Sequence, residues 1–282
     1  MSSHPTTAVS RNTLRTLHAA YLRKEKLAML TAYDYVTAGL LDNSGVDILL
    51  VGDSLGNVVL GYDTTLPVTL EDMIRHTSAV VRGTKKALIV ADLPFGTTTD
   101  PEVALRASIR LMQESGCQAV KLEGGLNAAP IVRRLVDQGI PVMAHIGLTP
   151  QSVHQLGGYY IHGKTDQSVR YLVDSAVALS EAGAFSIVLE MVVPAVAAEI
   201  TQSLGIPTIG IGSGTDCSGQ VLVINDLVGL SLRPPPKFAV PRGNVAAVIR
   251  DAVREYILDV KGPSLPVGSA RPDPSRETPI PL

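Results

Sequence analysis

The sequence predicts an α/β protein with a single (β/α)₈ (TIM) barrel, and three observations support this fold class. Eight short aliphatic runs alternate with helical patterns along the 282 residues, a length suited to one barrel of about 250 residues. The runs are almost continuously apolar, as expected of parallel strands buried on both faces. Apolar residues make up 45% and charged residues 18% of the chain, which excludes a disordered or coiled-coil protein. A doubly wound open sheet is the alternative.

The predicted elements follow one another in the order that a barrel requires. A helix is predicted near the N-terminus, where Leu14, Leu17 and Tyr21 share one face. Three further helices each end near a glycine, which commonly terminates a helix, and they cover 101–115, 169–181 and 245–260. The strands are predicted at 28–32, 48–51, 88–91, 119–122, 142–145, 186–189, 208–211 and 221–224.

The chain is predicted to divide into a barrel and a tail. Residues 1–262 would form the barrel domain with its N-terminal helix. Residues 263–282 contain six prolines and no apolar period, so we expect a disordered tail.

The composition limits the kinds of binding partner and the cellular compartment that we expect for this protein. A net charge of −2 gives no reason to expect nucleic acid, and no apolar stretch approaches the roughly 20 residues of a membrane span. Cys117 and Cys217 form neither a zinc spacing nor a disulfide framework, which fits a reducing compartment. The basic N-terminus resembles a transit peptide but lacks an apolar signal core. We therefore expect a cytoplasmic protein.

Three carboxylates follow consecutive strands at the end where barrel enzymes place their active sites. Asp53, Asp92 and Glu123 occupy these positions. Oxygen ligands at one rim suit Mg²⁺, whereas zinc would require cysteine or several histidines. The alternative is that each carboxylate caps the helix that follows it.

Two further charged residues stand at strand ends. Lys121 lies two residues before Glu123 and therefore on the same strand face; it would bind a substrate carboxylate or form a structural ion pair. Glu190 follows a wholly apolar run and would act as a general base, since burial raises the proton affinity of a carboxylate. A helix cap remains the alternative for Glu190. His145 also ends a strand, which is a weaker signal.

Two glycine-rich segments have open interpretations. Residues 210–214 follow the seventh strand, where barrels often bind phosphate. They do not form a dinucleotide fingerprint. Residues 157–163 have glycines at both ends, as a mobile loop over the site would. Ordinary turns are the alternative for both segments.

The chain resembles the ketopantoate hydroxymethyltransferase (3-methyl-2-oxobutanoate hydroxymethyltransferase) family in a series of short segments. These segments run in the family's order across about residues 12–258, and together they are highly specific. They are TAYDY (31–35), VGDSLG (51–56), TLPVT (65–69), ADLPF (91–95), VKLEGG (120–125), HIGLTPQ (145–151), LGGY (156–159), LE (189–190), IGIG (209–212), GQVLV (219–223) and PKF (236–238).

The resemblance implies a barrel that assembles into a large homo-oligomer, decameric in related enzymes. It implies Mg²⁺ as the metal and 5,10-methylenetetrahydrofolate as co-substrate. Residues matching the family's metal-associated carboxylates are Asp53, Asp92 and Glu123. Those matching its 2-oxoacid contacts are Asp53, Ser54, Asp92 and Lys121, and Glu190 matches its proposed proton acceptor. Strand-end reasoning had selected all of these except Ser54.

The implied reaction converts 3-methyl-2-oxobutanoate to 2-dehydropantoate in pantothenate and coenzyme A biosynthesis, through a Mg²⁺-stabilised enolate formed by Glu190. Small departures occur at 191–194, at Ser218 and after Phe238. One alternative is a Mg²⁺-dependent 2-oxoacid lyase or mutase of the isocitrate lyase and phosphoenolpyruvate mutase type. Such enzymes usually carry a cysteine in a short glycine-rich loop, and neither cysteine here sits that way. The other alternative is a non-catalytic barrel.

Overall fold

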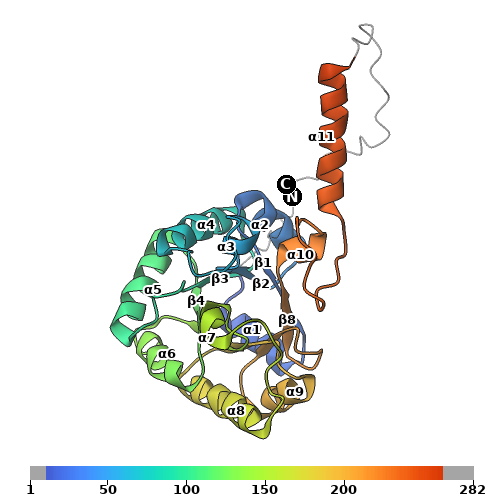
Figure 1. The fold of residues 1–282 in the computed structure, drawn as a ribbon. Coiled ribbons are helices and arrows are strands. Elements are labelled where there is room, and N and C mark those ends of the chain that lie inside the picture. Colours follow the sequence, from blue (N-terminus) through green and yellow to red (C-terminus); the bar gives the residue numbers. More distant parts are fainter. Residues whose placement is uncertain (1–10, 263–282) are drawn as a thin grey trace, which may run out of the picture.

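Eight parallel strands close into a barrel in the computed structural model, which describes residues 11–262 (Figure 1). Each strand pairs with its sequence neighbours, and β1 pairs with β8. The barrel prediction is confirmed, and the open-sheet alternative is wrong. The strands are β1 (Leu27–Thr31), β2 (Ile48–Val51), β3 (Leu88–Asp92), β4 (Ala119–Glu123), β5 (Val142–Gly147), β6 (Ser186–Glu190), β7 (Thr208–Ile211) and β8 (Gly219–Leu222).

Helices cover the outside of the barrel and begin and end where local chemistry favours it. Asp100 caps α5, Pro101 occupies its first turn, and Gly116 ends it with a φ of 82°. The helices are α1 (Leu14–Leu22), α2 (Tyr35–Asn43), α3 (Leu55–Val58), α4 (Leu70–Gly83), α5 (Pro101–Ser115), α6 (Ala129–Val136), α7 (Val153–Leu156), α8 (Asp166–Glu181), α9 (Pro194–Ser203), α10 (Ile224–Val228) and α11 (Val245–Lys261), with 3₁₀ turns η1 (Leu126–Ala128) and η2 (Pro150–Ser152).

Some predicted boundaries moved for identifiable reasons. The last strand lies at β8 instead of 221–224, because Gly219 pairs with Leu27 and Ile224 already begins α10. Helix α8 begins before 169, because Thr165 caps it by accepting a hydrogen bond from the Ser168 backbone N–H.

The core has two layers, one inside the barrel and one between strands and helices. Helix α1 closes the N-terminal end of the barrel, where Leu17 is 4% exposed and packs with interior residues such as Leu27 and Ile48. Burying such a leucine contributes about 1.5–3 kcal/mol. Because all eight strands are parallel, the polar residues at their C-terminal ends lie together at the opposite rim.

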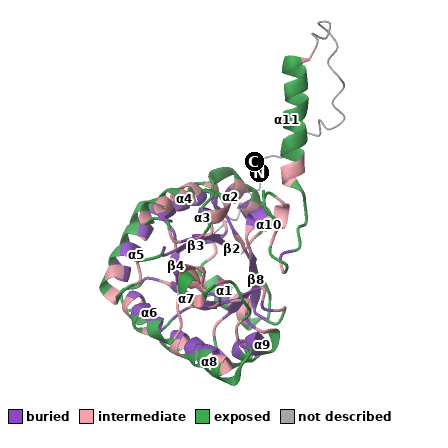
Figure 2. Cartoon of the chain, in the orientation of Figure 1, coloured by how far each residue is buried: buried purple, intermediate pink, exposed green. Residues whose placement is uncertain are grey.

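Helix α11 projects away from the barrel (Figure 1) and has no buried residue (Figure 2). The predicted tail, 263–282, lies outside the described residues, so its disorder and the domain division stay predictions. None of the helices within residues 11–262 is long and apolar enough to cross a membrane.

Candidate active site

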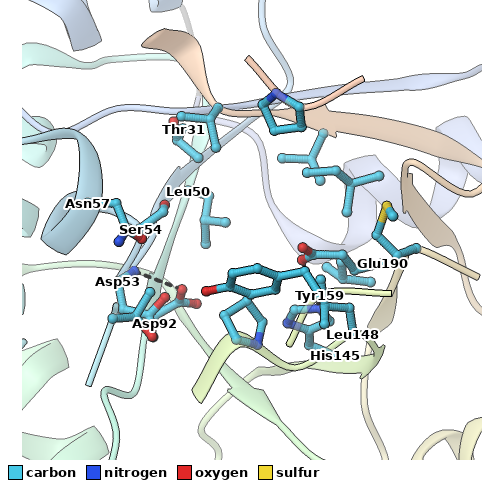
Figure 3. Close-up of a pocket in the computed structure, with 18 of the residues that line it drawn as sticks. Thr31, Leu50, Asp53, Ser54, Asn57, Asp92, His145, Leu148, Tyr159 and Glu190 are labelled. Atoms are coloured by element: carbon cyan, nitrogen blue, oxygen red, sulfur yellow. Dashed lines mark hydrogen bonds and ion pairs between the residues drawn. The ribbon is translucent and has the colours of Figure 1, made fainter. Parts of the chain in front are cut away.

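A cavity of about 620 Å³ opens at the C-terminal ends of the strands, a size typical of sites for small molecules and cofactors. Figure 3 shows Asp53, Ser54 and Asp92 on one side, Glu190 on the other, and Tyr159 between them. Every residue predicted for the site lines this cavity, and His145 joins them: Asp53, Ser54, Asp92, Lys121, Glu123, His145 and Glu190.

The two-residue period of a strand explains why these side chains converge. Buried residues inside the barrel are followed two positions later by polar residues that face the same interior. Along β4 the apolar Ala119 is followed by Lys121 and Glu123. The same change from apolar to polar occurs from Val90 to Asp92, from Met143 to His145 and from Val188 to Glu190.

An ion pair joins the ends of β3 and β4. Asp92 and Lys121 are register partners, and Lys121 Nζ lies 3.0 Å from Asp92 Oδ1. The other Asp92 oxygen accepts a hydrogen bond of 3.0 Å from the Asp53 backbone N–H. Both side chains of the ion pair are at most 5% exposed, so the pair is shielded from water and Lys121 cannot be removed without stranding a buried charge.

The predicted alternative that these carboxylates cap helices is wrong. Helix α5, which follows Asp92, is capped by Asp100. No side chain caps α3, η1 or α9, the elements that follow Asp53, Glu123 and Glu190. The four carboxylates are therefore not explained by helix capping.

Burial and mutual repulsion act together on the acidic groups. Burial, and next the Asp92 carboxylate, raise the pKa of Asp53 to about 7. Burial and the charge of Asp53 likewise raise the pKa of Glu123 well above its ordinary value. Burial lowers the pKa of Lys121, but Asp92, Glu123 and Asp53 outweigh it and raise that pKa above its ordinary value. Lys121 therefore stays cationic, while the carboxyl groups of Asp53 and Glu123 resist ionisation.

His145 links the lysine to Glu190. Its Nδ1 lies 3.2 Å from Lys121 Nζ, and its Nε2 lies 3.2 Å from Glu190 Oε2, off the direction of a well-aligned hydrogen bond. Burial, and next the charge of Lys121, lower the pKa of His145, so the imidazole is neutral at neutral pH. Because an ammonium can only donate, Nδ1 is the acceptor and Nε2 carries the proton that faces Glu190.

Glu190 stands at a turn that neighbouring loops hold in place. Its side chain is 17% exposed, and the next residue, Met191, has a φ of 50°, a strained value for a residue other than glycine. Gly147 pairs with Glu190 at a φ of 95°, where a Cβ would collide with the Glu190 carbonyl. The backbone is therefore strained next to Glu190, as is common at functional sites.

Both glycine-rich segments support this turn. Ser213, in the segment 210–214, accepts a hydrogen bond from the Val192 backbone N–H and donates to the Leu189 carbonyl. His162, in the segment 157–163, donates its backbone N–H to the Met191 carbonyl at 2.7 Å. The contacts of segment 210–214 thus agree with a structural turn, and its phosphate interpretation stays a prediction.

Sequence reasoning missed three polar residues of the site. The Tyr33 hydroxyl lies 2.8 Å from Ser54 Oγ, and an extension of the strand-end rule to two residues beyond Thr31 would have found it. Gln151 hydrogen-bonds to Asp53 and Glu123 from the loop after β5. Tyr159 lines the cavity from the same loop. No strand period reaches these last two, because they belong to irregular structure.

The donor set fits Mg²⁺ bound by few protein ligands. Asp92 Oδ1 is buried, and its partner among the described residues is Lys121 Nζ at 3.0 Å, without the geometry of a hydrogen bond. When ionised, Asp53, Asp92 and Glu123 exceed Lys121 by two negative charges, which a divalent cation would neutralise. Within residues 11–262 no three His, Cys, Asp or Glu side chains form a group that could itself hold a metal. Mg²⁺ commonly uses one or two carboxylates and completes its shell with water and substrate, so the three-carboxylate assignment stays a prediction.

Comparisons with known proteins show which family the sequence is related to. A family model described as Ketopantoate hydroxymethyltransferase matches residues 11–267. A 3-methyl-2-oxobutanoate hydroxymethyltransferase from Chloroflexus aurantiacus is 50% identical over 94% of this chain and 95% of its own. One from Carboxydothermus hydrogenoformans is 52% identical, over 86% and 88%.

Solved structures of lyases and mutases share only the fold. A 2,3-dimethylmalate lyase aligns with a TM-score of 0.59 at 19% identity, over 92% of this chain and 91% of its own. A phosphoenolpyruvate phosphomutase from Streptomyces platensis subsp. rosaceus aligns with a TM-score of 0.61 at 13% identity, over 89% and 88%. The sequence relationship, in contrast to the fold, is to the hydroxymethyltransferases. The chain therefore belongs to the ketopantoate hydroxymethyltransferase family and is an enzyme of that class.

Proposed function

We propose that the protein transfers a hydroxymethyl group from 5,10-methylenetetrahydrofolate to C3 of 3-methyl-2-oxobutanoate. Water supplies the hydroxyl oxygen, and 2-dehydropantoate and tetrahydrofolate leave. The observation that carries this proposal is the division of the cavity. Lys121 and three buried carboxylates lie on one side and Glu190 on the other, with neutral His145 between them. A 2-oxoacid placed between the two sides would present its carboxylate to Lys121 and its C3 proton to Glu190.

Asp53, Asp92 and Glu123 would hold Mg²⁺, which when bound supplies Lewis-acid stabilisation of the charge that develops on the 2-oxo oxygen. Lys121 would bind the substrate carboxylate as a fixed cation. Ser54 would add a hydrogen bond, with its hydroxyl oriented by Tyr33. These contacts would orient the substrate before any bond changes.

Glu190 would remove the C3 proton. Water would hydrolyse both bonds that join the one-carbon unit to N5 and N10 of the folate, which releases tetrahydrofolate and leaves formaldehyde. C3 would then attack the formaldehyde carbon, and the formaldehyde oxygen would take up a proton to become the new hydroxyl. His145 would lie beside Glu190, with Nε2 at 3.2 Å, without competing for the substrate proton, since its lowered pKa keeps it neutral. The strained turn at Met191 would hold the carboxylate at the cavity wall.

The folate would lie against Arg233, Lys237 and Phe238, which also line the cavity. These side chains suit a co-substrate with an aromatic head and a polyanionic tail. We also propose that the protein is cytoplasmic. Cys117 and Cys217 are buried free thiols, and a reducing compartment maintains thiols in this state.

Exchange of the C3 proton in D₂O tests the enolisation step without folate. The protein is incubated with 3-methyl-2-oxobutanoate, with and without Mg²⁺, and the C3 signal is followed by NMR. Mg²⁺-dependent exchange supports the proposal, and addition of the folate should then give 2-dehydropantoate. Neither exchange nor product with both substrates and Mg²⁺ present would contradict it.

The metal-free protein should become less stable as the pH rises from 4 to 7. Asp53 has a folded-state pKa of about 7 against an ordinary value of 3.8. The folded protein therefore binds the proton more tightly than the unfolded chain, so this stability is present below pH 4 and is lost through pH 7. Mg²⁺ binds the ionised carboxylates, so a fixed Mg²⁺ concentration should raise the Tm more at pH 8 than at pH 5.

Thermal unfolding in the presence of a chelator, at several pH values, measures this dependence. Asp53→Asn should flatten part of the slope because the asparagine does not titrate. A Mg²⁺ shift in Tm that is the same at pH 5 and pH 8 would contradict the expectation.

The protein is further proposed to be a homo-oligomer that uses α11. One face of α11 repeats apolar residues every three or four positions without burying any of them. Tyr256 and Val248 on this face are each 68% exposed. A second copy of the chain would cover this face, which comprises Val245, Val248, Ile249, Ala252, Val253, Tyr256, Ile257 and Val260.

Val253→Asp should dissociate such an oligomer, because it places a charge in the apolar contact at a cost of several kcal/mol. Light scattering after gel filtration would report a smaller mass than for the wild type. Leu258→Asp is the matched control, since Leu258 is 69% exposed and lies on the opposite face of α11. A Val253→Asp variant of unchanged mass would argue against α11 as the contact.

A further inference from the structure

Gln151 connects parts of the site that the strand ladder does not join. It lies in η2, after β5, yet its contacts reach the ends of β2, β3 and β4. Its side-chain Nε2 donates to Asp53 Oδ2 at 2.8 Å and to the Leu93 carbonyl at 3.0 Å. Its backbone N–H donates to Glu123 Oε2 at 3.0 Å. One residue therefore binds two of the three clustered carboxylates.

These bonds define how Gln151 is oriented. Both partners of Nε2 are acceptors, a carboxylate and a carbonyl, so both amide hydrogens are engaged and the amide cannot be flipped without losing them. One oxygen of each carboxylate accepts a hydrogen bond from Gln151, and the other oxygen does not contact it. The contact therefore fixes the position of one oxygen of Asp53 and one of Glu123.

Gln151 contacts the carboxylates without lining the cavity. It is partly buried and is not among the residues that line the cavity, whereas Asp53 and Glu123 are. Because Gln151 contacts the carboxylates and does not line the cavity, we infer that its effect on chemistry passes through the carboxylates. Its hydrogen bond also favours the ionised form of Asp53, against the burial that opposes ionisation.

We propose that Gln151 is a positioning residue that holds Asp53 and Glu123 in the orientation needed to bind a divalent cation. This inference rests on the proposed function, which places the cation at these carboxylates. The physical reason is that the carboxylates repel one another, so without this donor they would turn apart or take up protons. Residues that orient metal ligands in this way typically change metal affinity about 10–100-fold when they are replaced.

Gln151→Met tests the side chain separately from the backbone. Methionine has a similar length and volume but donates no hydrogen bond, while the backbone N–H to Glu123 remains. Mn²⁺ serves as the probe, and its binding to the substrate-free protein is followed by the loss of the free Mn²⁺ signal in electron paramagnetic resonance. We expect the Mn²⁺ dissociation constant to rise about 10–100-fold.

Two further variants separate positioning from folding. Gln155→Met makes the same change one turn later at an exposed position in α7, and its Mn²⁺ affinity should match the wild type. Gln151→Asn keeps an amide but is one methylene too short to keep both bonds. It should also weaken Mn²⁺ binding, and it replaces Gln151→Met if that variant does not fold.

The outcomes distinguish the two proposals. A folded Gln151→Met variant that binds Mn²⁺ within twofold of the wild type, while Asp53→Asn does not, overturns the positioning role and leaves the metal proposal intact. A wild-type protein that does not bind Mn²⁺ overturns both. Weakened binding with unchanged gel-filtration behaviour supports both.

Discussion

Glu190→Gln should abolish Mg²⁺-dependent exchange of the C3 proton of 3-methyl-2-oxobutanoate, with a loss of about 10²–10⁴-fold, the usual contribution of a general base. Glutamine has the shape of glutamate, and its carbonyl oxygen can still face His145 Nε2, which lies 3.2 Å from Oε2 of Glu190. It cannot accept a proton from carbon, however. The defect should therefore appear in the rate and not in substrate affinity.

NMR in D₂O gives the exchange rate, and calorimetry gives the dissociation constant of the substrate with Mg²⁺ present. Glu199→Gln is the control, since Glu199 is exposed on α9 and makes the same chemical change away from the cavity. Exchange in Glu190→Gln at the rate of the control would show that another group removes the proton.

Lys121→Met should be the most destabilising single change at the site. Lys121 is 4% exposed and pairs with Asp92 at 3.0 Å. Removing one partner of a buried ion pair typically costs about 3–5 kcal/mol, because the other charge is left without compensation. The substrate would also lose the cation proposed to bind its carboxylate, so KM should rise.

A second substitution separates these two effects. Lys121→Met combined with Asp92→Asn removes the stranded charge and should recover much of the free energy of unfolding, while substrate affinity stays low. Urea unfolding at fixed protein concentration and substrate titration measure the two quantities. Lys85→Met, at an exposed position, should change stability by less than about 0.5 kcal/mol. Equal stability of the Lys121→Met variant and this control would refute the structural role of the ion pair.

The strand-end residues show how far a period of two carries a prediction. The aliphatic runs located the strands because a buried parallel strand must be apolar on both faces. Since interior residues recur every second position, the polar residues that end β3, β4 and β6 had to face the interior: Asp92, Lys121, Glu123 and Glu190. Segment resemblance added Ser54, which lies beyond the end of β2.

The contacts between these residues could not be predicted from the two-residue period of the strands. Local spacing left helix capping open for each carboxylate, and only the structure shows that Asp100 caps α5. The proton position on His145 depends on Lys121, 24 positions away in the chain. The sequence predicted a helix at 245–260, but only the structure shows that the apolar face of α11 is exposed, because periodicity does not say what a helix packs against.

The sequence by itself therefore determined the barrel, the rim at which the chemistry gathers and most of the side chains that supply it, because these follow from periodicity and chain direction. The tertiary structure alone decided which charges meet. Closure of the ring brings the ends of β2 to β6 around one cavity, and the loop after β5 carries Gln151 to Asp53, 98 positions away in the chain. Such contacts depend on distances in space, and pKa values and hydrogen-bond partners depend on those distances.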